Sequence, residues 1–265
     1  MRRASKEVAA TAGTPTVRII GPGRAGRALA TALDRAGWVV DGPLGRDAVL
    51  DRAASGVDLV VIATPDATIA EVADAVEPSD AVVAHLAGSV GLEVLAPHPR
   101  RAAVHPLVPL PADDRAADRL AGATFAVAGD PIARRVAEDL GGRPIEIADD
   151  RRAAYHAAAC IAANHLVALL GQVDRVAAQA GVPLDAYLEL VRATVDDVEA
   201  LGPADALTGP VARGDLATVE RHLAALDPEE RPAYEALAAA AARLTDRGRP
   251  LDCGGDRAGR SGADG

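Results

Sequence analysis

The stretch that decides the fold is Thr16-Val17-Arg18-Ile19-Ile20-Gly21-Pro22-Gly23-Arg24-Ala25-Gly26, which leads into an Ala- and Leu-rich segment at 27–33. A β-branched run ends at Gly21, and a helical pattern follows directly after the glycines. Gly21 allows a tight turn, Gly23 lets the backbone approach a phosphate, and Gly26 lets the helix pack on the strand. Because the N–H groups of a helix N-terminus attract anions, the turn predicts a dinucleotide site. Its expected cofactor-binding residues are Gly21, Pro22, Gly23, Arg24, Ala25 and Gly26.

Strand and helix patterns alternate downstream of this turn. Further strands are expected at 38–44, 57–63, 81–85, 102–104, 125–128 and 144–147. The helices between them are expected at 25–36, 69–75, 91–95 and 132–140, with Asp66 or Thr68 capping the second. Short connections between alternating elements predict an α/β fold with a Rossmann-like, doubly wound, mostly parallel sheet.

The pattern changes at Asp149-Asp150, after which only helical periodicity remains. Helices are expected at 151–179, 184–201, 215–226 and 231–244, the third of them capped by Asp215. We therefore expect a disordered tail at 1–15, a dinucleotide-binding domain at 16–149, an all-α substrate and dimerisation domain at 150–247, and a second disordered tail at 248–265. Because the helices are apolar on more than one face, they are expected to pack on a second subunit as a homodimer.

Composition excludes several classes of protein. The 265-residue chain is 49% hydrophobic and carries a formal charge of −10 without long blocks of one sign, which argues against nucleic-acid binding. The expectation is that no apolar run spans a membrane and that no secretory signal is present. Cys160 and Cys253 stand far apart, which suggests neither a disulfide framework nor a metal site and fits a cytoplasmic location. Lys6 is the only lysine, so lysine-based catalysis is not expected.

The end of the second strand usually selects between NAD and NADP. An acidic residue there binds the ribose of NAD, whereas an arginine pairs with the extra phosphate of NADP. Asp41 favours NAD, and Arg46 favours NADP. We expect NADP, with NAD as the alternative, because Leu44-Gly45-Arg46 reads as the strand end. Thr64-Pro65 follows the third strand and is expected to complete the cofactor cleft.

Candidate catalytic residues cluster after later strands and on the first long helix. Ser89 follows the fourth strand, and His105 follows the fifth. His156, Cys160 and Asn164 are spaced i, i+4, i+8, which places them on one helix face. We expect His105 or His156 to supply a proton and Asn164 with Ser89 to orient a carbonyl group. Arg213 and Thr208 are expected to hold the carboxylate of a small-molecule substrate.

Together these stretches resemble a bacterial family labelled domain of unknown function 2520. The resemblance rests on Ile19–Gly26, Val104–Leu107, Tyr155–Ala159 and Leu207–Asp215. It implies a relation to ketopantoate reductases, β-hydroxyacid dehydrogenases and pyrroline-5-carboxylate reductases. Ketopantoate and β-hydroxyacid enzymes carry a catalytic lysine one turn before an asparagine that Asn164 matches, but Cys160 stands at the lysine position here.

The expected function is therefore that of an NAD(P)-dependent oxidoreductase acting on a small carboxylate-bearing carbonyl compound, with ketopantoate as the named candidate. Two alternatives remain open. One is an imine reductase of the pyrroline-5-carboxylate type, in which the missing lysine matters less. The other is a non-catalytic NADP-binding sensor or scaffold.

Overall fold

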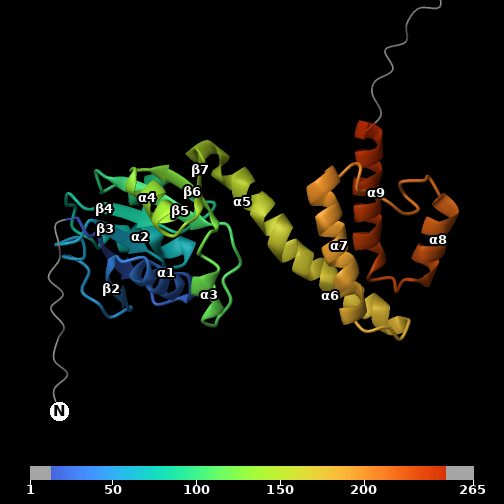
Figure 1. The fold of residues 1–265 in the computed structure, drawn as a ribbon, viewed down its shortest axis with the longest axis horizontal. Coiled ribbons are helices and arrows are strands. Elements are labelled where there is room, and N and C mark those ends of the chain that lie inside the picture. Colours follow the sequence, from blue (N-terminus) through green and yellow to red (C-terminus); the bar gives the residue numbers. More distant parts are fainter. Residues whose placement is uncertain (1–12, 249–265) are drawn as a thin grey trace, which may run out of the picture. The chain divides into compact units, whose positions relative to one another are not determined.

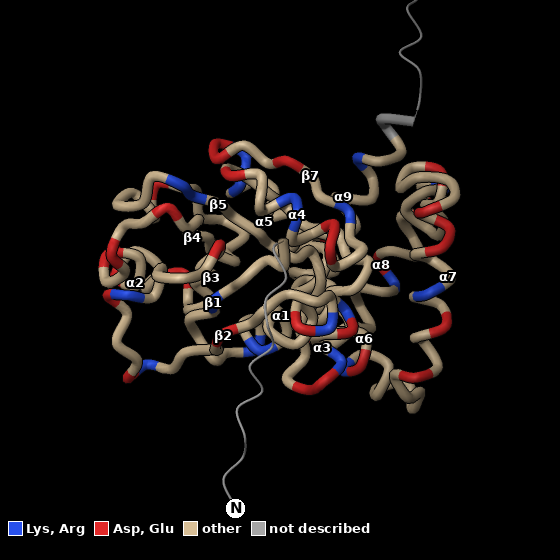
Figure 2. The backbone as a smooth tube through the Cα atoms, turned by 60° about the vertical axis from the view of Figure 1, so that its left-hand side comes forward, with Lys and Arg blue, Asp and Glu red and all other residues tan. Residues whose placement is uncertain are grey.

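The computed structural model describes residues 13–248, which divide into two compact units on either side of the His165–Leu166 bond (Figure 1). Most of both predicted tails, together with Lys6 and Cys253, lies outside the described residues. Acidic and basic residues are interspersed along the chain of both units (Figure 2), without a large block of one sign.

The first unit is built on a seven-stranded sheet with the order β2-β1-β3-β4-β5-β6-β7. Its strands are β1 Thr16–Ile20, β2 Val39–Leu44, β3 Leu59–Ile62, β4 Val82–His85, β5 Arg101–Pro106, β6 Thr124–Gly129 and β7 Arg143–Glu146. All neighbouring strands pair in parallel except β5 and β6, which are antiparallel. The predicted Rossmann-like, mostly parallel sheet is confirmed.

Helices cover both faces of this sheet. They are α1 Arg24–Arg35, α2 Ile69–Asp74, α3 Arg115–Asp118 and α4 Ile132–Asp139, with 3₁₀ turns η1 Asp66–Thr68, η2 Leu92–Leu95 and η3 Asp149–Arg151. Successive strand residues point to opposite faces, so Val17 and Ile19 pack with α1 whereas Ile20 packs in the opposite layer. The apolar strand runs are thus explained by burial on both faces.

Local details differ from the sequence expectations in four places. Neither Asp66 nor Thr68 caps α2 through its side chain, because the Thr68 hydroxyl donates to the Pro65 carbonyl at 2.9 Å instead. The helix expected at 91–95 is a 3₁₀ turn, and β5 extends to Pro106, which places His105 within the strand. The short α3 was not expected.

The remaining residues are helical. The elements are α5 Arg152–Cys160, a π-helical turn η4 Ile161–His165, α6 Leu166–Gln179, α7 Asp185–Leu201, α8 Leu216–Ala225 and α9 Arg231–Gly248. The Asp215 side chain accepts a hydrogen bond from the Thr218 N–H at 3.1 Å, which confirms the predicted cap. The change from strands to helices comes at the expected residue 149, whereas the two compact units divide inside the helical run.

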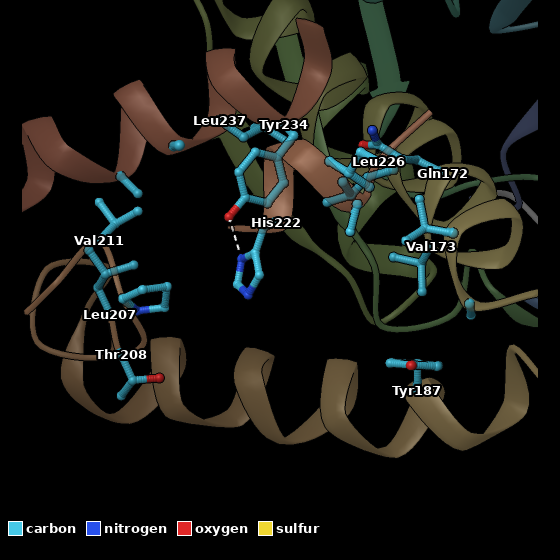
Figure 3. Close-up of a pocket in the computed structure, with 17 residues that line it drawn as sticks. Gln172, Val173, Tyr187, Leu207, Thr208, Val211, His222, Leu226, Tyr234 and Leu237 are labelled. Carbon is cyan, nitrogen blue, oxygen red and sulfur yellow. Dashed lines mark hydrogen bonds between the residues drawn. The ribbon is translucent and has the colours of Figure 1, made fainter. Parts of the chain in front are cut away.

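An apolar cavity of about 590 Å³ lies within the second unit, between α6, α7, α8 and α9 (Figure 3). The His222 imidazole lies at its wall and is 2.7 Å from the Tyr234 hydroxyl. The Gln172 side chain donates to the Glu230 carbonyl at 2.8 Å, and Arg175 pairs with the Glu230 carboxylate, so α6 is fastened to the start of α9.

One helical run, Asp149–Gln179, is long and apolar enough by length and composition to cross a membrane. The expectation that no such segment exists is therefore wrong on these two criteria. A helix whose apolar side chains pack on another protein passes the same test. The Val167 side chain of this helical run, for example, is 71% exposed in the single chain.

Candidate active site

The glycine turn between β1 and α1 has the geometry that a bound diphosphate requires. Gly21 has φ +110°, and a Cβ there would lie 2.6 Å from the Ala63 carbonyl oxygen. A Cβ on Gly26 would lie 2.1 Å from the Gly21 oxygen, so only glycine allows this close packing. A Cβ on Gly23 would meet only Ala63, at 3.9 Å, which leaves the approach to the backbone open. Gly23 also precedes the twelve-residue helix α1, whose first N–H groups have no side-chain cap.

A cleft of about 490 Å³ runs from this turn to the end of β2. It is lined by Gly21, Pro22, Gly23, Leu44, Arg46, Thr64 and Pro65, among others. The Thr64 hydroxyl is buried and has no hydrogen-bond partner in the described structure. An unpaired hydroxyl is costly, so this atom is suited to a ligand group. Arg24 and Ala25 line a second, adjoining cavity of about 420 Å³ together with Thr64 and Pro65. The cleft thus brings the predicted cofactor-binding residues to one edge of the sheet.

Asp41 and Arg46, the two candidates for cofactor selection, differ in their partners. Asp41 pairs with Arg18 across β1 and β2, at 2.7 Å from both Nε and Nη2 of that arginine. Arg46 lies two residues after the end of β2 at Leu44 and lines the cleft. Asp41 is therefore occupied within the sheet, whereas the exposed Arg46 is available to a ligand phosphate.

His105 lines two cavities, one beside the glycine turn and one beside α5. Its side chain lines the 420 Å³ cavity beside Gly23 and Thr64. It also lines a cavity of about 570 Å³ that contains Tyr155, His156, Cys160 and Asn164. The predicted helix face is therefore present, although the π-helical turn at 161–165 alters the spacing before Asn164. Two elements far apart in sequence, β5 and α5, meet at this histidine.

The ring of His105 is held by two aromatic neighbours. Its Nδ1 atom is 2.7 Å from the Tyr155 hydroxyl, and the two rings meet edge to face. The His156 ring meets it in the same manner, with centroids 5.5 Å apart. Gly88 permits this contact, because a Cβ there would lie 2.9 Å from His105 Nε2 and 2.3 Å from His156 Nδ1. The two histidines therefore converge on a residue that has no side chain.

Burial sets the protonation state of His105. Burial, with smaller electrostatic contributions from His156, Arg152 and His85, lowers the pKa of His105 to about 4. The imidazole is therefore neutral at pH 7 and carries a single N–H. As a neutral ring it is a weak acid on its own, which changes how it can deliver a proton.

Two further residues, His85 and Arg152, both lie beneath the loop after β4. His85 accepts from the Ala87 N–H at 3.2 Å and is 3.2 Å from the Gly91 carbonyl, so it holds this loop. Arg152 has no exposed surface and donates to the Ala87 carbonyl at 2.9 Å. Its Nε and Nη1 atoms find no hydrogen-bond partner among residues 13–248. Spacing offered a signal for it, since Arg152, Tyr155 and His156 share one helix face.

The remaining predicted residues are less connected. Ser89 is exposed, whereas Ala87 and Gly88 of the same loop after β4 are buried. Thr208 lines the apolar cavity of the second unit, and Arg213 lies near it in the loop before α8. The role of these two residues in holding a carboxylate stays a prediction. Within residues 13–248, no three His, Cys, Asp or Glu side chains form a group that could hold a metal ion.

A glycine turn on a Rossmann-like sheet, followed by a helical region, defines a class of nucleotide-binding fold. Residues 123–241 match the family described as Domain of unknown function (DUF2520), which covers less than half of the chain. This agrees with the resemblance seen in Tyr155–Ala159 and Leu207–Asp215. No curated protein matches the chain.

Solved structures resemble the chain over most of its length. A protein from Bacteroides fragilis, named a "putative NADP oxidoreductase", is 21% identical with a TM-score of 0.73, over 87% of this chain and 98% of that one. Pyrroline carboxylate reductase from Plasmodium falciparum, with NADP bound, is 14% identical with a TM-score of 0.57, over 87% and 98%. A reductive aminase from Aspergillus terreus, in complex with NADPH4, is 16% identical with a TM-score of 0.65, over 89% and 95%. At these identities the likeness is one of fold.

Proposed function

We propose that this protein is an NADP-dependent oxidoreductase that reduces a C=O or C=N bond in a small molecule. The observation that supports this most directly is the position of His105, which lines both the cavity beside the glycine turn and the cavity beneath α5. A proton-carrying group thereby lies next to the nucleotide cleft. A reductase needs such a group to protonate the atom on which negative charge develops.

The residues of the first unit fit NADP. The first N–H groups of α1 and the open face of Gly23 would hold the diphosphate, and Arg46 would pair with the additional phosphate of the adenosine ribose. The unpaired Thr64 hydroxyl supplies a further donor. Bound NADPH would supply the hydride. Two of the fold neighbours named above were solved with NADP or NADPH4, which supports the same choice.

Within the substrate class, two observations favour a C=N over a C=O bond. Cys160 replaces the lysine that the ketopantoate and β-hydroxyacid enzymes carry, so a charged proton donor is missing at that position. Two of the fold neighbours are named as a pyrroline carboxylate reductase and a reductive aminase. We therefore place imine reduction ahead of ketopantoate reduction. Asn164 lines the same 570 Å³ cavity as His156, and its amide would orient the substrate there.

The test is a matched screen of 2-oxo acids, including ketopantoate, and of cyclic imines, including pyrroline-5-carboxylate, with NADPH and with NADH. We expect oxidation of NADPH by at least one imine. Preferential turnover of a 2-oxo acid would reverse the substrate order. Tight NADPH binding without turnover of any compound would favour the sensor or scaffold function instead.

We further propose a homodimer formed through the helical region. Large apolar side chains of α6 and α7, among them Val167 and Leu190, are mostly exposed in the single chain. The second unit also contains the open apolar cavity of Figure 3. The exposed apolar helix surface and the open apolar cavity belong to the same chain. A second copy of the chain could therefore cover both of them in a symmetric dimer. Light scattering should give twice the mass of the chain, and Val167→Asp should reduce it to a monomer. A monomeric wild-type protein would exclude this assembly.

A further inference from the structure

We propose that Tyr155 is the proton source of this site, acting through His105, and that buried Arg152 stabilises the phenolate left behind. The inference rests on the proposed reductase function, because the proton is delivered to the group that the reductase reduces. It also makes statements about His105 that hold in the protein alone.

The first step concerns which nitrogen of His105 carries its hydrogen. A neutral imidazole has one N–H and one bare nitrogen, and Nδ1 is 2.7 Å from the Tyr155 hydroxyl. A phenol is a stronger acid than neutral imidazole, so the hydroxyl donates and Nδ1 accepts. The hydrogen of His105 therefore lies on Nε2, the nitrogen facing Gly88 and His156.

The second step concerns the transfer itself. A neutral His105 cannot give up the Nε2 hydrogen unless Nδ1 receives another, because an imidazolate is too unstable. Tyr155 provides it: the Tyr155 O–H and His105 Nε2–H bonds break, and His105 Nδ1–H and substrate O–H or N–H bonds form. His105 is neutral before and after, its hydrogen having moved from Nε2 to Nδ1. The negative charge ends on the Tyr155 oxygen.

The third step concerns that charge. Burial raises the pKa of Tyr155, and the positive charge of Arg152 acts against this rise. Arg152 is fully buried, and its Nε and Nη1 atoms have no partner in the described part of the chain. The carboxylates of Asp149 and Glu93 favour the charged form of Arg152, but neither hydrogen-bonds to its two unpaired nitrogens, so the buried guanidinium can stabilise a further anion. The phenolate of Tyr155 is such an anion, formed during each reaction.

The chain offers a matched control. His222 and Tyr234 repeat the same pair in the second unit, with a 2.7 Å hydrogen bond and edge-to-face rings (Figure 3). Tyr155→Phe and Tyr234→Phe each remove one hydroxyl and keep the ring. The two variants therefore distinguish an effect at His105 from a general effect of losing a phenol.

The first experiment reads the protonated nitrogen of each histidine by ¹⁵N NMR at pH 7, with assignment by His105→Gln and His222→Gln. In the wild type we expect hydrogen on His105 Nε2. In Tyr155→Phe we expect the His105 Nδ1 signal to shift, because this nitrogen loses its hydrogen-bond donor, whereas Tyr234→Phe should move the His222 signals alone. Unchanged His105 signals in Tyr155→Phe, or hydrogen on Nδ1 in the wild type, would overturn the proposal.

The second experiment measures kcat and KM between pH 5 and 8 with the best compound from the screen. Tyr155→Phe should lower kcat by about 100-fold with little change in KM, which is the usual size of a general-acid contribution. The pH profile should change as well. Without the phenol only charged His105 can donate, so kcat should fall about tenfold per pH unit where the wild type is flat. The charged or titratable groups facing His105 are Tyr155, His156, Arg152 and His85. If kcat of Tyr155→Phe fell by the same factor at every pH, so that its pH profile stayed flat, Tyr155 would have a structural role and the relay would be refuted.

The third experiment tests Arg152 through the titration of ¹³C-labelled Tyr155. Arg152→Gln should move this titration to higher pH by about one pH unit, and the exposed neighbour Arg151→Gln should not. If Arg152→Gln does not fold, Arg152→Lys retains the charge and should keep the wild-type titration. An unchanged midpoint in the Gln variant, or an altered one in the Lys variant, would remove Arg152 from the proposal. If no compound is reduced at all, the reductase function fails while the NMR results still decide the hydrogen position of His105.

Discussion

Alanine at Gly23 and alanine at Gly26 should affect different properties of the same turn: the first NADPH binding, the second the stability of the fold. The two glycines are three residues apart and both flank the start of α1, yet their surroundings differ. A methyl group at residue 23 would have Ala63 as its nearest neighbour, at 3.9 Å, and the backbone there has φ −71°, which alanine adopts without strain. A methyl group at residue 26 would lie 2.1 Å from the Gly21 oxygen and 3.2 Å from the Ala63 side chain.

The expected magnitudes follow from these distances. Gly23→Ala should change the free energy of unfolding by no more than about 0.5 kcal/mol, because nothing is displaced. The methyl group would stand where the backbone must approach a phosphate, so NADPH affinity should fall at least tenfold, or about 1.4 kcal/mol. Gly26→Ala forces the turn and helix apart and should cost about 3 kcal/mol of stability. For a chain of this size that lowers the melting temperature by roughly 5–10 °C.

The assay combines thermal unfolding without ligand with calorimetric titration of NADPH. Gly23→Ala should melt with the wild type and bind weakly, whereas Gly26→Ala should melt early. Wild-type NADPH affinity in Gly23→Ala would refute the assignment of this turn to the diphosphate. A stable Gly26→Ala protein would refute the packing argument.

Three further predictions concern single side chains. Arg46→Ala should reduce the preference for NADPH over NADH at least tenfold, measured as the ratio of the two dissociation constants, because the phosphate loses its guanidinium partner. Trp38→Phe should cost about 1–2 kcal/mol in urea unfolding, because buried Trp38 donates to the Asp139 carboxylate at 2.8 Å. Hydrogen bonds from Thr16 lower the pKa of Asp58, so its contribution to stability is full above pH 3.8 and lost as the pH falls through the lowered value. Asp58→Asn should therefore be less stable than the wild type in urea unfolding at pH 7, with the difference shrinking in acid.

Sequence alone determined the sheet, the helical region and the glycine turn. These features depend on local patterns: Leu59–Ile62 is apolar on both faces because the strand is buried on both, and Gly21, Gly23 and Gly26 meet steric demands set by their immediate neighbours. The cap at Asp215 is local in the same way, since its partner is three residues away. The predicted side-chain cap of α2 is absent, because the Thr68 hydroxyl donates to the nearby Pro65 carbonyl instead.

Tertiary structure alone decided which polar side chains meet. His105 and Tyr155 are 50 positions apart, and their hydrogen bond depends on how α5 passes the end of β5. Asp41 pairs with Arg18 because the strand register sets the two residues opposite each other. In the sequence, Arg152 is an ordinary charged residue at the start of a helix. Only the tertiary structure shows that it is buried against the Ala87 carbonyl. Burial and contacts between distant elements set protonation states and partners, and no local pattern carries that information.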